Sequence, residues 1–279
     1  MKLKIFAAVA AVLFNLIAPV ASAGPLTSRL ESGAAIRIGF ANSPPYAFVG
    51  PGGEPAGFMN AYVINLLKKM GYTKLEVVTS DFSGLIPALQ AGRIDIVTSG
   101  LYIKKDRCST IAFTDPMLKT ADALLVPKGN PKGLQNYEDV AKKNATMTAV
   151  VGYATIDSAK KFGVPADRIM QLPDGPSVLA AVRSGRADAA ANSDLSLQAQ
   201  AKGADGSVEV TDSSKMPEST FNWVAFGLRK TDFDFISKFN AAQKEFLGSP
   251  EMLSVVAPFG YSEKQLPGST SLEWICENR

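Results

Sequence analysis

The chain has 279 residues, of which 46% are hydrophobic and 20% charged; its formal net charge is +3, and it contains no histidine. There is enough apolar chain for one large domain or two modest ones, and the scattered basic residues indicate no nucleic-acid-binding patch. The lack of histidine excludes Ser-His-Asp triads, Cys-His dyads and the commonest metal ligand, and two cysteines cannot form a structural zinc site. We therefore predict no metal and no cofactor.

The first 23 residues have the pattern of an export signal. Two lysines precede an apolar run over residues 5–20, and Ala21-Ser22-Ala23 is a typical cleavage site, so we expect cleavage after Ala23. No cysteine stands at that site, which argues against a lipid anchor. No later run reaches the roughly 18 apolar residues of a membrane span. The mature chain is therefore expected in the periplasm.

Strand and helix patterns alternate after the signal. Residues 36–40 alternate as a strand does, and the two prolines at 44 and 45 stiffen the turn that follows and orient Tyr46. The next helix has an apolar face at positions i, i+3, i+4 and i+7, made of Val63, Leu66, Leu67 and Met70. A strand at 75–78, a short helix at 85–91 and a strand at 94–97 continue the rhythm of an α/β fold.

The strand at 94–97 leads into small polar residues that suit a ligand site. The Ser99 hydroxyl can hydrogen-bond to a ligand, and Gly100 lets backbone N–H groups approach that ligand closely. Arg107 follows, and its planar guanidinium can donate two parallel hydrogen bonds to a carboxylate. We predict a carboxylate site here. The alternative is that Arg107 pairs on the surface with Asp106 or Asp115.

An internal repeat indicates two similar lobes. Residues 85–99 match residues 178–192 at a constant offset of 93, which pairs Asp95 with Asp188 and Ser99 with Asn192. Ligands of open α/β sheets bind beyond the carboxyl ends of the strands, so both strand ends should face one crevice. A chance match of a common helix–strand unit is the alternative.

A Pro/Gly-rich segment at 127–131 marks the predicted boundary between the lobes. The first lobe is expected to comprise residues 24–127 and 224–279, and the second residues 128–223. In the second lobe, a strand ends at Gly152 and a helix begins near residue 156. The N-terminal amides of that helix and the Thr155 hydroxyl would form an anion site, the alternative being a plain N-cap role for Thr155.

The segment S-G-x-x-I-x-x-x-R followed by I-A-F-T-D-P, at residues 99–116, resembles the signature of the periplasmic solute-binding proteins that supply polar amino acids to ABC importers. The resemblance covers essentially the whole mature chain. It implies a two-lobed α/β periplasmic binding protein of type II, each lobe a mixed sheet flanked by helices, with the ligand in the interlobe cleft. The expected partners are a carboxylate-bearing small solute and an inner-membrane ABC permease, with no enzymatic activity and a monomeric protein.

Within that family, Leu101-Tyr102, Cys108 and the tail at 257–268 are most similar to the ectoine- and hydroxyectoine-binding branch. This resemblance, together with export, implies a disulfide between Cys108 and Cys276, two separate thiols being the alternative. It also implies that aromatic side chains wall the ligand, although Tyr46 could instead close the local core. The predicted ligand-binding residues are Tyr46, Phe82, Ser99, Gly100, Tyr102, Arg107, Gly152, Thr155, Asn192 and Ser193.

The pocket lacks the acids with which relatives that bind ordinary amino acids hold the α-ammonium group. Residues 36–53 contain no acid, and the position after Asn192 is Ser193, with Asp194 displaced by one. An unpaired ammonium in an apolar cleft would cost several kcal/mol. We therefore expect a solute with a carboxylate and a delocalised or less basic nitrogen. The resemblance to the ectoine-binding branch implies ectoine as the first candidate, and a cyclic or sugar-derived opine is the second.

Two other classes of protein compete with the binding-protein interpretation. A cleft enzyme resembling cyclohexadienyl dehydratase would need a general acid or base in the cleft, against which the missing histidine weighs. A sensor domain would need a membrane tether, and the sequence indicates none.

Overall fold

The computed structural model describes residues 23–279, so the predicted export signal lies outside the described residues except for Ala23. The α-helices are α1 (Pro25–Glu31), α2 (Phe58–Lys69), α3 (Leu85–Gln90), α4 (Lys105–Thr110), α5 (Tyr137–Lys142), α6 (Ala154–Lys161), α7 (Gly175–Arg183), α8 (Asp194–Lys202), α9 (Phe233–Phe246), α10 (Pro250–Val256) and α11 (Leu272–Asn278). The strands are β1 (Ile36–Phe40), β2 (Phe48–Val49), β3 (Pro55–Ala56), β4 (Leu75–Thr79), β5 (Ile96–Tyr102), β6 (Ala112–Phe113), β7 (Leu118–Pro127), β8 (Met147–Val150), β9 (Ile169–Leu172), β10 (Ala189–Ser193), β11 (Val208–Val210) and β12 (Phe221–Leu228).

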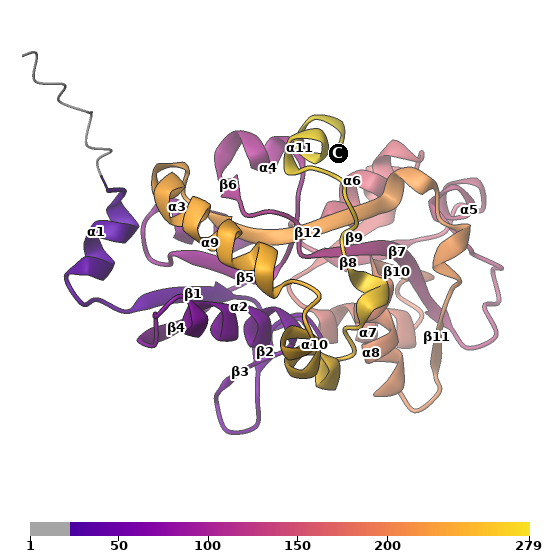
Figure 1. Ribbon diagram of the computed structural model, residues 1–279. Coiled ribbons are helices and arrows are strands. Elements are labelled where there is room, and N and C mark those ends of the chain that lie inside the picture. The colour runs from indigo at the N-terminus through magenta and orange to yellow at the C-terminus, as the bar shows by residue number, and fades with distance from the viewer. Residues whose placement is uncertain (1–22) are drawn as a thin grey trace, which may run out of the picture.

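The main strands lie in the order β4-β1-β5-β12-β7-β10-β8-β9 (Figure 1). In one half, β1 pairs in parallel with β4 and β5, and in the other half β8 pairs in parallel with β9 and β10. Parallel neighbours need crossover connections. These are α2 and α3 in the first half and α6 and α7 in the second, so both halves have the same order of strands and helices. We call the halves the first and second lobe.

The long strands β7 and β12 join the lobes. Leu118 to Ala121 of β7 pair with β12, whereas the residues from Asp122 to Leu125 pair with β10 of the second lobe. The partner changes between Ala121 and Asp122, ahead of the Pro/Gly-rich segment at 127–131. We therefore propose that the chain first crosses between the lobes inside β7, and we call Ala121-Asp122 the crossing point.

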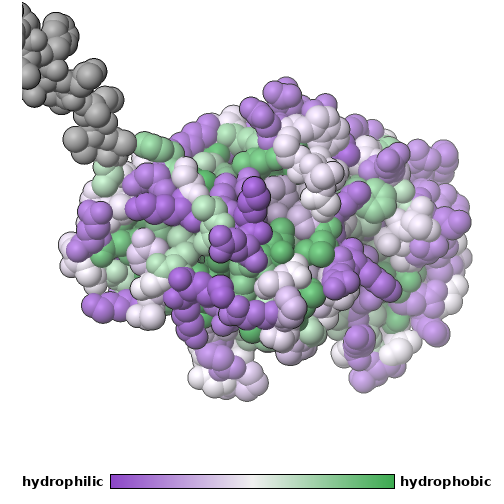
Figure 2. All heavy atoms as spheres, in the orientation of Figure 1, coloured by the Kyte–Doolittle hydropathy of each residue, from purple (hydrophilic) through white to green (hydrophobic). Residues whose placement is uncertain are grey.

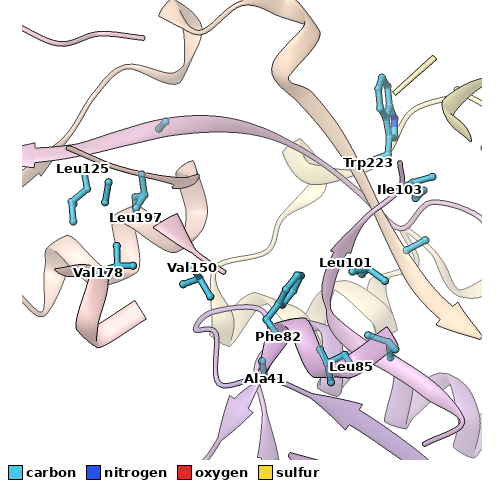
Figure 3. Packing of buried hydrophobic residues seen from close by; sticks show 14 of the residues in the cluster. Ala41, Phe82, Leu85, Leu101, Ile103, Leu125, Val150, Val178, Leu197 and Trp223 are labelled. Atoms are coloured by element: carbon cyan, nitrogen blue, oxygen red, sulfur yellow. The ribbon is translucent and has the colours of Figure 1, made fainter. Parts of the chain in front are cut away.

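The hydrophobic core of the first lobe confirms the predicted face of α2. Val63, Leu66 and Leu67 are fully buried against β1, β5 and β12, and Gly71 follows the helix with a positive φ of 89°. A separate cluster contains residues of both lobes, and Figure 3 shows Phe82 of the first lobe beside Val150 of the second. The two lobes are therefore packed together on the cleft side.

The repeated aspartates have the same backbone role in each lobe. The Asp95 carboxylate accepts a hydrogen bond from the backbone N–H of Arg37 at 2.9 Å, and Asp188 accepts one from Thr146 at 2.8 Å. Each aspartate thus ties the start of one parallel strand to its neighbour. The repeat therefore reflects equivalent structure in the two lobes.

Asp95 also binds three guanidinium groups, those of Arg29, Arg37 and Arg229. Burial alone would raise the pKa of Asp95, but hydrogen bonds from Arg37 and Arg229 lower it below its ordinary value. The carboxylate is fully buried. It is therefore the counter-charge for a cluster of arginines.

We expect Asp95→Ala to lower the free energy of unfolding by about 3–5 kcal/mol, because it leaves partly buried arginines without their counter-charge. Asp188→Ala is the matched control, because its carboxylate is 26% exposed and pairs with one exposed lysine, Lys132. We expect it to cost only about 1 kcal/mol. Urea denaturation of both variants measures the difference. Equal losses would show that Asp95 acts only through its backbone hydrogen bond.

Candidate ligand-binding site

A pocket between the lobes has about 350 Å³ of empty space, including space open to solvent. It contains every predicted ligand-binding residue except Gly152. The lining residues are Ser43, Tyr46, Phe82, Ser99, Gly100, Tyr102, Arg107, Tyr153, Ala154, Thr155, Asn192, Ser193 and Ser196. Side chains far apart in the sequence meet here because β5 and β10 both end at the cleft.

Arg107 lies in α4, directly after β5, and is only 8% exposed. Its guanidinium donates to the backbone oxygen of Tyr102 and to that of Gly152, each at 2.9 Å, and lies 5.7 Å from the centre of the Phe82 ring. Burial lowers the pKa of Arg107. No ion pair with this guanidinium is present within residues 23–279, so the predicted alternative of pairing with Asp106 or Asp115 is not found. A buried cation therefore faces the pocket without a carboxylate partner.

Gly152 reaches the site through its backbone. It lies outside the pocket lining, but its carbonyl oxygen accepts the hydrogen bond from Arg107 of the opposite lobe. A Cβ atom at position 152 would press against Ser83. The φ angle of Gly152 is +82°, a conformation that favours glycine. Glycine therefore lets the second lobe approach Ser83 of the first lobe closely.

Two residues at the end of β5 have local partners. The Ser99 hydroxyl accepts a hydrogen bond from the Ala41 N–H at 3.0 Å and is 3.4 Å from the Ala41 carbonyl. Gly100 has a φ of +69°, and a Cβ there would collide with the Tyr46 ring. Gly100 thus makes room for an aromatic wall of the pocket.

The second lobe contributes the start of α6. The first N–H groups of a helix have no partner within it, and Ala154 and Thr155 both line the pocket. Tyr153 is the N-cap residue, so the predicted alternative of an N-cap role for Thr155 is wrong. The Thr155 hydroxyl donates to the Ala191 carbonyl at 3.5 Å. This helix start is suited to an anion.

Aromatic rings from both lobes enclose the pocket. Tyr46, Phe82 and Tyr102 come from the first lobe, as predicted, and Tyr153 comes from the second. Sequence reasoning missed Tyr153 as a contact, although it lies inside the Gly152–Thr155 segment. It also missed Ser43, Ala154 and Ser196, of which Ser43 directly precedes the two prolines.

Two carboxylates lie behind the pocket wall and not in its lining. Asp122 accepts hydrogen bonds from the hydroxyls of Tyr137 at 2.8 Å and Tyr102 at 3.4 Å, and burial raises its pKa to about 7. Asp194 accepts one from Thr120 at 3.1 Å, and burial raises its pKa too. Two carboxyl groups, whose burial favours the neutral form, thus lie one layer away from the ligand space.

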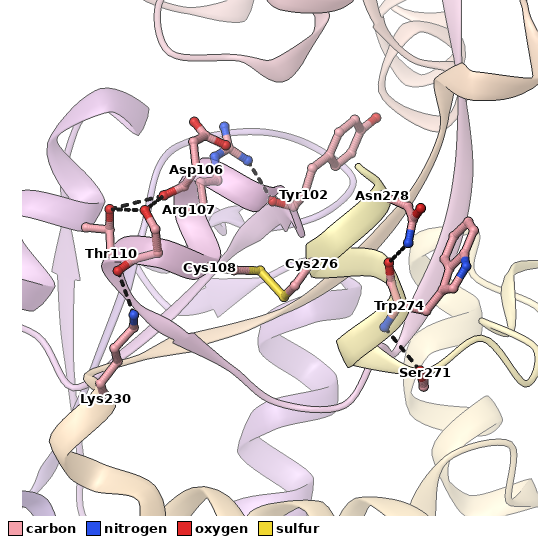
Figure 4. The surroundings of a disulfide bond; sticks show 11 residues. Tyr102, Asp106, Arg107, Cys108, Thr110, Lys230, Ser271, Trp274, Cys276 and Asn278 are labelled. Atoms are coloured by element: carbon pink, nitrogen blue, oxygen red, sulfur yellow. Dashed lines mark hydrogen bonds between the residues drawn. A yellow bond between two sulfur atoms is a disulfide. The ribbon is translucent and has the colours of Figure 1, made fainter.

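A disulfide supports the helix that carries Arg107. Cys108 of α4 is bonded to Cys276 of α11, with 5.8 Å between their Cα atoms (Figure 4). The Lys105 N–H also donates to the backbone oxygen of Arg279 at 2.8 Å. The C-terminal helix is therefore fixed to the first lobe next to the pocket.

Comparison with known proteins identifies the family. The model of the bacterial extracellular solute-binding proteins, family 3, matches residues 36–259. The chain belongs to this family. The probable amino-acid ABC transporter periplasmic-binding protein y4tE of Sinorhizobium fredii is 30% identical over 282 residues, covering 98% of this chain and 93% of that protein.

Two solved structures are similar to this solute-binding protein. EhuB in complex with hydroxyectoine has a TM-score of 0.81 and 32% identity, covering 89% of this chain and 96% of EhuB. The ancestral amino acid-binding protein AncCDT-1, a precursor of cyclohexadienyl dehydratase, has a TM-score of 0.74 and 26% identity, covering 86% of this chain and all of that one. The expected family and the type II periplasmic binding protein fold are confirmed.

Two features are absent from residues 23–279. Within that range no three histidine, cysteine or acidic side chains are grouped as metal ligands would be. None of the helices described there combines the length and apolar character that crossing a membrane requires.

Proposed function

We propose that this protein binds a small carboxylate-bearing zwitterion in the periplasm and delivers it to an inner-membrane ABC permease. The observation that carries the proposal is Arg107, a buried guanidinium without a carboxylate partner among the described residues. A buried charge is costly unless a counter-charge and hydrogen bonds compensate it. A ligand carboxylate would supply both, and the start of α6 would bind it from the second lobe.

The cationic end of the ligand would lie among aromatic rings. The pocket lining contains no acid, while Asp122 and Asp194 lie behind it. The faces of tyrosine rings can bind a delocalised cation, whereas a compact buried ammonium needs a direct carboxylate partner. Ectoine, whose positive charge is delocalised over a ring amidine, is therefore the first candidate, supported by the similarity to EhuB. An opine is the second.

Delivery requires the ligand to favour the closed form. A ligand can shift the balance between open and closed forms only through contacts that differ between them. Arg107 and Tyr102 approach the pocket from the first lobe, and Thr155 and Asn192 from the second. A solute that touches both sets holds the lobes together.

We propose a binding role without catalysis. The carboxyl with a pKa near 7, Asp122, does not line the pocket, and proton transfer needs hydrogen-bond reach to the ligand.

We also propose that the protein is a monomer, because the large exposed hydrophobic side chains of residues 23–279 lie on separate elements. They are Val49, Val77, Phe233 and Trp274. Figure 2 shows hydrophilic and hydrophobic residues interspersed on one face of the molecule.

A thermal-shift screen followed by calorimetry tests the ligand assignment. The panel comprises ectoine, hydroxyectoine, opines, glutamine and arginine. Ectoine is expected to bind with micromolar or tighter affinity and the α-amino acids at least about 100-fold more weakly, because their ammonium lacks a direct acid. A ligand at 100 times its Kd should add roughly 2.7 kcal/mol to the free energy of unfolding. Micromolar binding of glutamine or arginine with no response to ectoine would contradict the assignment.

A further inference from the structure

Tyr153 bridges the cleft between the lobes. It belongs to the second lobe, but its hydroxyl is 3.1 Å from the Ser43 hydroxyl of the first lobe. Its ring lies edge-on to the ring of Phe82, also of the first lobe, with 4.5 Å between the ring centres. These contacts place one aromatic ring across the mouth of the ligand pocket.

On the far side of Tyr153 the cleft opens into wider grooves. One groove, with about 1230 Å³ of empty space, shares Tyr153 and Phe82 with the pocket and is lined further by Asp81 and Asp174. A second, of about 710 Å³, shares Tyr153 and Ser43. Tyr153 lines the pocket and both grooves, so its ring is a partition between them.

From this position we propose that Tyr153 determines ligand specificity by setting an upper limit on ligand length. The inference rests on the proposed function, in that the ligand carboxylate lies at Arg107. A longer ligand would have to extend past Tyr153 into the grooves. The groove beyond contains the carboxylates of Asp81 and Asp174, so with the ring removed it would accept a chain that ends in a cation.

The test uses ω-amino carboxylates, which have a carboxylate at one end, an ammonium at the other and no α-ammonium group. Calorimetry measures 4-aminobutyrate and 8-aminooctanoate binding to the wild-type protein, Tyr153→Ala and Tyr153→Phe. We expect Tyr153→Ala to bind 8-aminooctanoate at least 10-fold more tightly than wild type does, with a smaller change for 4-aminobutyrate. Tyr153→Phe keeps the ring but loses the hydrogen bond to Ser43, and we expect it to keep excluding the long probe.

The proposal fails if Tyr153→Ala shows no gain for 8-aminooctanoate, or if Tyr153→Phe gains as much. Thermal melting of both variants establishes that they are folded. Adding Arg107→Ala to Tyr153→Ala separates this proposal from the proposed function. If the long probe still binds to the double variant, Tyr153 is the partition but Arg107 is not the carboxylate anchor.

Discussion

Replacing Arg107 with alanine is expected to weaken ligand binding by at least roughly 30-fold and leave the protein folded. The guanidinium is buried, and it would form a bidentate, desolvated bond with the ligand carboxylate. Removing one partner of such a pair costs about 2–5 kcal/mol, which is a loss of roughly 30- to 5000-fold in affinity. Lysine should restore little of it, because an ammonium lacks the planar fork.

Calorimetry with the solute that the thermal-shift screen identifies measures this loss. Arg93→Ala is the matched control, because it removes the same type of side chain from an exposed turn of the same lobe. We expect the control to bind like wild type. Affinity within a few fold of wild type in Arg107→Ala would show that the carboxylate binds elsewhere.

Asp122→Asn is expected to change how stability depends on pH. Burial raises the pKa of Asp122 from 3.8 to about 7, so the folded protein holds this proton more tightly than the unfolded chain does. Ionisation of the folded form therefore costs stability, and the cost grows as the pH rises from about 4 to about 7. Asparagine does not ionise, and its carbonyl can still accept a hydrogen bond from Tyr137.

Relative to wild type, Asp122→Asn should gain about 3 kcal/mol in free energy of unfolding between pH 4.5 and pH 8. Urea denaturation at the two pH values gives this difference directly. Asp167→Asn, which changes an exposed side chain in the second lobe, should show almost none. A parallel pH dependence in Asp122→Asn and wild type would mean that Asp122 titrates normally.

Asp122 lies where the two lobes join. Asp122 lies opposite Ser193 in the pairing of β7 with β10, directly after the crossing point. It also accepts the hydrogen bond from Tyr102, which lines the pocket. One buried carboxyl therefore lies next to both the connection between the lobes and a wall of the ligand site.

Local sequence determined the fold class and one side of the site. The alternation of strand and helix patterns predicted an α/β protein, and the motif at 99–116 predicted the family, both of which are confirmed. Gly100, Tyr102 and Arg107 could be found because they lie on one strand and the helix that follows it. Residues this close in the sequence, on one strand and the following helix, are also close together in the fold. The repeat at an offset of 93 led to Asn192 for the same reason, since equivalent strands end at the same cleft.

Only the tertiary structure decided the features that join distant segments. Tyr153 meets Ser43 and Phe82 because the lobes close on one another, and periodicity along the chain carries no information about that contact. The pairing partner of β7 changes between Ala121 and Asp122, ahead of the glycines and prolines of 127–131, and on this change we base the proposed crossing point. Asp122 sits within an apolar run, but its raised pKa comes from burial between two neighbouring strands, which forms only when the whole sheet is assembled.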